Sequence, residues 1–111
     1  SHTEQRCPVE ATLSVVGGKW KAVIFGSLLG GTKRFHELQQ ALTQPTRKVL
    51  TEQLRELESD GLVVRTVYPQ VPPKVEYSLS EYGKSFIPVL KTMGNWGFVH
   101  MERSRKAQPD V

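Results

Sequence analysis

Two amphipathic helical patterns separated by only three residues constrain this chain most. They cover residues 35–42 and 46–60, and the apolar residues on their inner faces are Phe35, Leu38, Leu42, Leu50, Leu54 and Leu57. Pro45 disfavours helix at the residue before it, and Gly61 follows the second pattern where a helix C′ glycine is expected. Short helices that meet at such a sharp corner indicate a helix-turn-helix.

The apolar period changes after this corner. Residues 62–68 and 74–79 alternate apolar with polar side chains, which is typical of strands, and the proline-rich loop 69–73 joins them into a hairpin. A helix-turn-helix followed by a hairpin is the element order of a winged helix. We therefore predict an α+β fold, a winged helix-turn-helix with a β-hairpin wing, in one domain over residues 1–111.

Further helices are predicted on both sides of this unit. The first covers residues 8–16, and the second covers residues 19–29 with an inner stripe of Trp20, Val23, Ile24 and Leu28. The last runs from residue 81 to about 106, and Pro88 should kink it or mark a restart. We expect residues 1–6 to be flexible and residues 107–111 to form a tail.

Composition narrows the class of protein. Hydrophobic residues make up 38% and charged residues 23% of the 111, no apolar run is long enough to span a membrane, and no secretory signal is visible. The single cysteine excludes an intrachain disulfide, which fits a reducing cytoplasm. We expect a cytoplasmic protein with no membrane partner. The net charge of +4 permits a polyanionic partner without proving one.

The charges of the helix at residues 46–60 run against its dipole. Arg47 and Lys48 lie in its first turn, while its acidic residues lie further along. A helix dipole favours the opposite arrangement by roughly 0.3–1 kcal/mol per well-placed charge at low salt. Cations at this end are therefore disfavoured unless an anion arrives. In duplex DNA, the phosphates and the acceptor edges of guanine would supply the complement to these cations. The alternative is a solvated helix with randomly placed charge.

The predicted DNA contacts follow from position on this helix and on the wing. Thr46, Arg47, Lys48 and Thr51 rank above Arg55, because the N-terminal end of a recognition helix normally lies deepest in the groove. The weaker candidates are Gln44 at the turn, Gln70 and Lys74 on the stiff wing, and Lys33 and Arg34 at the start of the preceding helix.

Several segments of the chain resemble the HxlR family of bacterial winged-helix regulators, which are relatives of the MarR type. The matching pieces are residues 7–9 (CPV), 17–20 (GGKW), 34–38 (RFHEL), 50–58 (LTEQLRELE), 60–63 (DGLV), 72–79 (PPKVEYSL) and 83–85 (GKS). They span most of the chain in order and at family spacing. Many relatives carry Ser-Gln where this chain has Thr46-Arg47, so the target sequence is expected to differ.

The resemblance implies a homodimer on a pseudo-palindromic operator, acting as repressor or activator. The dimer would be built from the first and last helices, whose candidate dimerisation residues are Val9, Leu13, Phe86, Leu90, Met93 and Trp96. Cys7 matches the cysteine with which many relatives sense oxidants or electrophiles. It also precedes a helix N-terminus, where the dipole lowers a thiol pKa. The alternative is a small residue packed at the dimer interface.

Other classes of function are weaker. The histidines have no metal-ligand spacing, and no nucleophile elbow, phosphate loop or paired-carboxylate site is visible, so we expect neither an enzyme nor a cofactor or metal. A winged-helix interaction module without DNA binding is one alternative. The other is a regulator gated by a small apolar ligand, with a pocket lined by Trp20, Tyr82, Phe86, Met93 and Trp96.

Overall fold

The computed structural model describes residues 7–42 and 45–107. In chain order the elements are α1 (Pro8–Val16), α2 (Lys21–Leu28), β1 (Lys33–Arg34), α3 (Phe35–Ala41), α4 (Arg47–Ser59), β2 (Val63–Tyr68), β3 (Lys74–Leu79), α5 (Glu81–Lys84) and α6 (Ile87–Ala107). The expectations for the start of the chain, for Gln44 and for residues 108–111 lie outside the described residues. Residue 107, placed in the tail above, ends α6 instead.

The helix ends follow local chemistry. The Thr46 hydroxyl caps α4 by accepting a hydrogen bond from the Val49 N–H at 3.1 Å. The Ser80 hydroxyl caps α5 in the same way, accepting from the Gly83 N–H at 2.9 Å. Gly61 follows α4 with a φ of 82°, a left-handed conformation that glycine adopts without strain.

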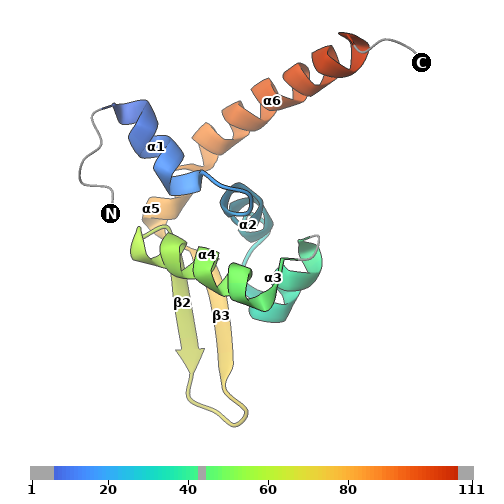
Figure 1. Ribbon diagram of the computed structural model, residues 1–111. Coiled ribbons are helices and arrows are strands. Elements are labelled where there is room, and N and C mark those ends of the chain that lie inside the picture. The colour runs from blue at the N-terminus through green and yellow to red at the C-terminus, as the bar shows by residue number, and fades with distance from the viewer. Residues whose placement is uncertain (1–6, 43–44, 108–111) are drawn as a thin grey trace.

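The wing belongs to a three-stranded antiparallel sheet with the order β1-β3-β2. β2 and β3 form the predicted hairpin, in which Arg65 lies opposite Tyr77, and Figure 1 shows it projecting away from the helices. β1 was not predicted. Its two residues pair with the middle of β3, with Arg34 opposite Glu76, and they bring the start of α3 beside the wing.

The core lies between α2, α3, α4 and the base of the hairpin, and its fully buried side chains are Ile24, Phe25, Leu38, Leu42, Leu50, Leu54 and Leu57. The prediction for α2 was wrong at Val23, which is 47% exposed, because Phe25 faces the core instead. Nearly every residue of α2 is apolar or small, so periodicity alone misplaced the inner stripe. Lys21 is also buried, and its ammonium pairs with the Glu56 carboxylate of α4 at 2.5 Å.

The C-terminal helical region is broken in two, as Pro88 predicted. α5 ends at Lys84, and α6 restarts at Ile87 with Pro88 in its first turn, where the missing N–H breaks no intrahelical bond. Figure 1 shows α6 extending away from the winged-helix body, and none of its residues is buried. No helix in the described part of the chain is both long and apolar enough to span a membrane.

Candidate nucleic-acid interface

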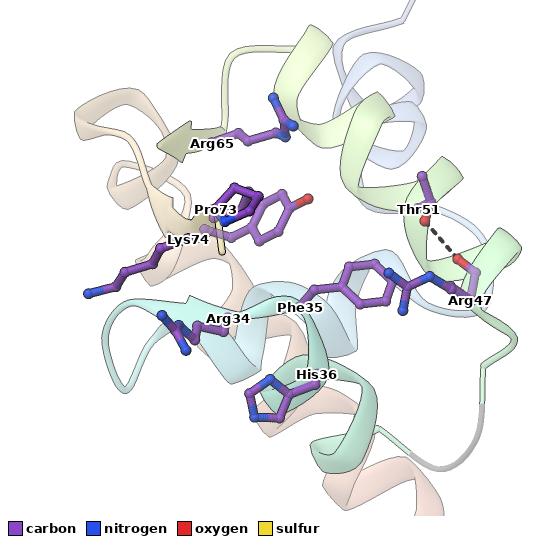
Figure 2. Close-up of a pocket in the computed structure, with 10 residues that line it drawn as sticks. Arg34, Phe35, His36, Arg47, Thr51, Arg65, Pro73 and Lys74 are labelled. Atoms are coloured by element: carbon purple, nitrogen blue, oxygen red, sulfur yellow. Dashed lines mark hydrogen bonds between the residues drawn. The ribbon is translucent and has the colours of Figure 1, made fainter. Parts of the chain in front are cut away.

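A hollow on the surface lies between the start of α3, the first turns of α4 and the hairpin (Figure 2). Its lining residues are Arg34, Phe35, His36, Arg47, Thr51, Arg65, Pro73, Lys74, Val75 and Tyr77. Four of them are arginines or lysines, and none of those described is acidic. The chain thus gathers positive charge from β1, α4, β2 and β3 at one place, which suits an extended anion.

Arg47 is positioned by an aromatic residue of the neighbouring helix. Its guanidinium carbon lies 4.6 Å from the centroid of the Phe35 ring, and Figure 2 shows the two groups side by side. Phe35 is half-buried and packs against the core, as predicted from its place on the inner face of α3. Phe35, which the core holds in place, therefore positions the side chain of Arg47 through a cation–π contact that the sequence did not predict.

The other predicted contacts of α4 differ in their freedom. The Thr46 oxygen is used as the helix cap, and the half-buried Thr51 donates its hydroxyl proton to the Arg47 carbonyl at 2.7 Å. Lys48 is exposed and lies outside the hollow. The first turn of α4 contains no acidic residue, and its last turn contains no basic one, so the predicted opposition of charge and dipole is present.

Arg65 was missed as a candidate. It lies on β2 opposite Tyr77 and lines both the hollow and an adjoining depression that contains Arg55 and Glu58. The sequence offered one signal for it, since Arg65 is a basic residue within the apolar–polar alternation of residues 62–68. The packing of β2 beside α4, which brings Arg65 next to Thr51, depends on contacts distant in sequence.

The wing holds its lysine in a small polar cluster. The Lys74 ammonium lies 3.5 Å from the Glu76 carboxylate and 5.0 Å from the centroid of the Tyr68 ring. The Tyr68 hydroxyl donates to the same carboxylate at 2.9 Å, and this bond together with the negative charge of Glu76 raises the pKa of Tyr68. Gln70 is exposed near the tip of the wing and does not line the hollow.

The two basic residues before α3 have separate surroundings. Arg34 is exposed and lines the hollow, and its backbone N–H donates to the Glu37 carboxylate at 2.7 Å, which fixes the start of α3. Lys33 is half-buried and lies outside the hollow. Of the predicted contacts, the structure thus brings together Arg34, Arg47, Thr51 and Lys74, places Arg55 in the adjoining depression, and sets Thr46, Lys48, Lys33 and Gln70 apart.

Cys7 is exposed and immediately precedes α1. The backbone N–H groups of Glu10 and Val9, which are free at the start of this helix, lower the pKa of the Cys7 thiol. A larger share of this side chain is therefore thiolate near neutral pH than in an unfolded chain.

The predicted dimerisation residues fall into two groups. Val9, Leu13 and Trp96 are 64%, 50% and 70% exposed, and Met93 is 39% exposed. Phe86 and Leu90 are half-buried and pack against the core of their own chain, with the Phe86 ring edge-on to Phe25 at 5.4 Å. α6 carries further exposed apolar residues that were not predicted for this role, namely Val89, Phe98, Val99 and Met101.

Comparison with known proteins decides the family. Residues 15–105 match the family model described as HxlR-like helix-turn-helix. The chain belongs to the HxlR family. It is 49% identical over 102 residues to the HTH-type transcriptional regulator YdeP of Bacillus subtilis, an alignment that covers 92% of this chain and 80% of YdeP. The HxlR chain is therefore a transcriptional regulator of the helix-turn-helix type and not an enzyme.

Solved structures agree with the HxlR assignment and with the winged-helix fold. The reduced form of the redox regulator HypR is 48% identical with a TM-score of 0.86, and the match covers 90% of this chain and 99% of HypR. The reduced form of the transcriptional regulator YodB of B. subtilis is 36% identical with a TM-score of 0.74, over 83% of this chain and 91% of YodB. In the described part of the chain, no group of His, Cys, Asp or Glu side chains could hold a metal ion.

Proposed function

We propose that this protein is a homodimeric regulator that binds double-stranded DNA at a pseudo-palindromic operator. The observation that carries the proposal is the hollow in which Arg34, Arg47, Arg65 and Lys74 converge from separate elements, with no described acidic residue among them. Membership of a helix-turn-helix regulator family supports the same partner.

We assign each part of the surface a role in this proposal. The N-terminal turn of α4 enters the major groove, where Arg47 and Lys48 donate to guanine edges or phosphates. The stiff hairpin reaches the flanking backbone through Lys74, and Arg34 and Arg65 hold the phosphates between helix and wing. None of the acidic residues later on α4 lines the hollow, although Glu58 lies in the depression that adjoins it.

The second half of the proposal is the dimer. α6 has 21 residues, and none of them is buried. Its apolar side chains are therefore open to water, and four of them are each at least 65% exposed, namely Trp96, Phe98, Val99 and Met101. Exposed apolar surface of this kind marks an interaction site. We assign it to a second copy of the chain, with α1 contributing Val9 and Leu13. Two copies of α4 would then reach successive major grooves, about 34 Å apart.

Salt-dependent binding tests the DNA half of the proposal. With random duplex, the logarithm of the affinity should fall linearly with the logarithm of salt concentration, at a slope of about −0.9 per phosphate contacted. Arg65→Ala should make that slope shallower by the contribution of about one phosphate contact. Lys91 is an exposed cation on α6, so Lys91→Ala should leave the slope unchanged. No binding at low salt would favour an interaction module that does not bind DNA.

A role for Cys7 as a thiol sensor is a second proposal. Its exposure and lowered pKa support it, as do the structural neighbours described as the redox regulator HypR, in reduced and oxidised forms, and as diamide-treated YodB. Diamide would take two electrons and two protons from two thiols, joining Cys7 either to a small thiol or to Cys7 of the second copy. Operator affinity should change on treatment of the wild type and stay constant in Cys7→Ser. An unchanged wild type, or an equal change in both, overturns the sensor.

A further inference from the structure

A second cavity, about 360 Å³ in volume, lies on the other side of the molecule between α1, the end of α4 and α5. It is distinct from the hollow described above and shares no residue with it. Its volume falls within the range of small-molecule sites. Of the five residues predicted to line an apolar ligand pocket, only Tyr82 and Phe86 belong to it.

Asp60 is the unusual residue of this cavity. Its carboxylate oxygen Oδ2 is enclosed by protein and has no hydrogen-bond partner in the described part of the chain. Asp60 also takes part in none of the ion pairs formed between described residues. Asp60 as a whole is only half-buried, but an enclosed oxygen without a donor is costly, because it has lost water without gaining a hydrogen bond.

The position of Asp60 adds to this cost. Asp60 is the C-cap of α4, where the partial negative charge of the helix dipole gathers. A carboxylate is therefore disfavoured at this end by the helix as well as by its enclosure. Both effects reverse when a cation arrives, so the site is electrostatically incomplete without one.

The other polar groups of the cavity also accept hydrogen bonds. Thr12 and Ser14 donate their protons to the carbonyls of Pro8 and Ala11 at 3.0 and 2.7 Å, and Ser85 donates to the carbonyl of Tyr82. Each hydroxyl has thereby used its proton and can only accept a further hydrogen bond. No lysine, arginine or histidine is among the described lining residues, so nothing there suits an anion.

The remaining walls are apolar. Val15, Leu62 and Phe86 line the cavity together with Tyr82, whose ring face can attract a cation. A hydrated metal ion would gain nothing from these walls, and one carboxylate is too few ligands for it. We propose that this cavity binds a small organic cation, a protonated amine on an apolar body, with its ammonium at Asp60.

Occupation of the cavity would join α1 to the winged-helix body. Ala11, Thr12, Ser14 and Val15 supply its wall from α1, the helix that follows Cys7 and carries the exposed Leu13. A bound ligand would therefore set the position of α1 and, through the dimer, the spacing of the two α4 helices. This regulatory consequence rests on the proposed DNA-binding function, whereas the binding of the cation does not.

Three probes of similar size test the proposal. 2-Phenylethylammonium, 2-phenylethanol and phenylacetate are titrated separately into the ¹⁵N-labelled full chain, followed by amide chemical shifts. The ammonium should give saturable shifts in α1 and at residues 60–62 and 82–86, with an affinity at least ~10-fold above that of the alcohol, as expected for a charge-assisted bond. Phenylacetate should not bind.

Variants separate charge from shape. Asp60→Asn should weaken the ammonium at least ~10-fold and raise the melting temperature, because it removes the uncompensated charge. Glu52→Gln, a matched exposed carboxylate of α4, should keep wild-type affinity, and Ala11→Leu should block the cavity with Asp60 intact. Equal binding of all three probes, unchanged binding in Asp60→Asn, or no binding at millimolar concentration overturns the proposal. These titrations contain no DNA, so they stand even if the protein fails to bind a duplex.

Discussion

At the scale of single residues, one contact joins the core to the surface proposed to bind DNA. The Arg47 guanidinium lies over the Phe35 ring, and Phe35 itself packs against the core. A flexible arginine at the start of a helix loses rotamer freedom when it binds a phosphate or a base. Because Phe35 already restricts Arg47, part of that loss has occurred before DNA arrives.

Replacing Phe35 by leucine should therefore weaken DNA binding without removing any DNA contact. A cation–π contact at an exposed site contributes about 0.5–1 kcal/mol, so the dissociation constant should rise roughly two- to fivefold. Affinity is measured well below the melting temperature, since the substitution also reduces core packing. In an Arg47→Ala background, Phe35→Leu should have no further effect. An equal effect in both backgrounds would show that Phe35 acts through stability instead.

The Cys7 thiol should react at a lower pH in the folded protein than in the unfolded chain. Free N–H groups at the start of α1 lower its pKa, and the thiolate is the reactive species. The midpoint of the alkylation rate with iodoacetamide, followed against pH, should lie below the midpoint measured for the same chain in urea. Coincident midpoints would remove the chemical basis of the proposed sensor.

At the scale of elements, the position of α5 against the segment that joins α4 to β2 depends on Gly83. A Cβ at this position would clash with the carbonyl oxygen of Leu62, which itself accepts a hydrogen bond from the Ser80 N–H. Gly83→Ala should therefore force α5 away from the Leu62 backbone and reduce the free energy of unfolding by at least ~2 kcal/mol. Urea unfolding measures the change.

Gly26 provides the matched control for that prediction. It lies inside α2, and a Cβ there would meet nothing within 4 Å. Gly26→Ala should therefore stabilise the protein by about 0.5–1 kcal/mol, because alanine is the better helix former. A similar gain in both variants would mean that helix propensity, not the close approach to Leu62, governs Gly83.

Most elements could be predicted because their signals are local. The helix pair and the hairpin have clear apolar periods, and Pro88 marks the restart of the last helix. β1 could not be found this way, since two residues show no alternation and their partner strand lies some 40 residues further along. The inner face of α2 was misplaced at Val23, because the apolar residues of a helix that is apolar on most sides do not single out one face as the buried one.

The candidate interface could be predicted only in part for a related reason. The order of charges along α4 is visible in the sequence and pointed to Arg47, which the structure places in the hollow. The support of Arg47 by Phe35 and the approach of Arg65 from β2 join segments that are far apart in the chain. Such juxtapositions follow from packing, which no local pattern reports.

At the scale of the whole molecule, the shape is incomplete for a single chain. The radius of gyration is 16.3 Å, whereas a compact protein of this length is expected near 13 Å. Figure 1 shows the reason, since α6 extends from the body instead of folding back on it. A helix in that position keeps its apolar residues in water unless a second copy covers them.

Trp96→Glu tests whether α6 is the dimer seam. Trp96 is 70% exposed in the single chain, so the substitution should leave the circular dichroism spectrum unchanged while placing a charge in an apolar interface. Sedimentation should show a dimer for the wild type and a monomer for the variant. Affinity for a palindromic duplex should fall more than ~10-fold, while affinity for a half-site should not change.

Val67→Glu is the control for association, because Val67 is 50% exposed on the wing, away from α1 and α6. A monomeric wild type, or a dimeric Trp96→Glu variant, would exclude α6 as the seam and leave its apolar residues without an explanation.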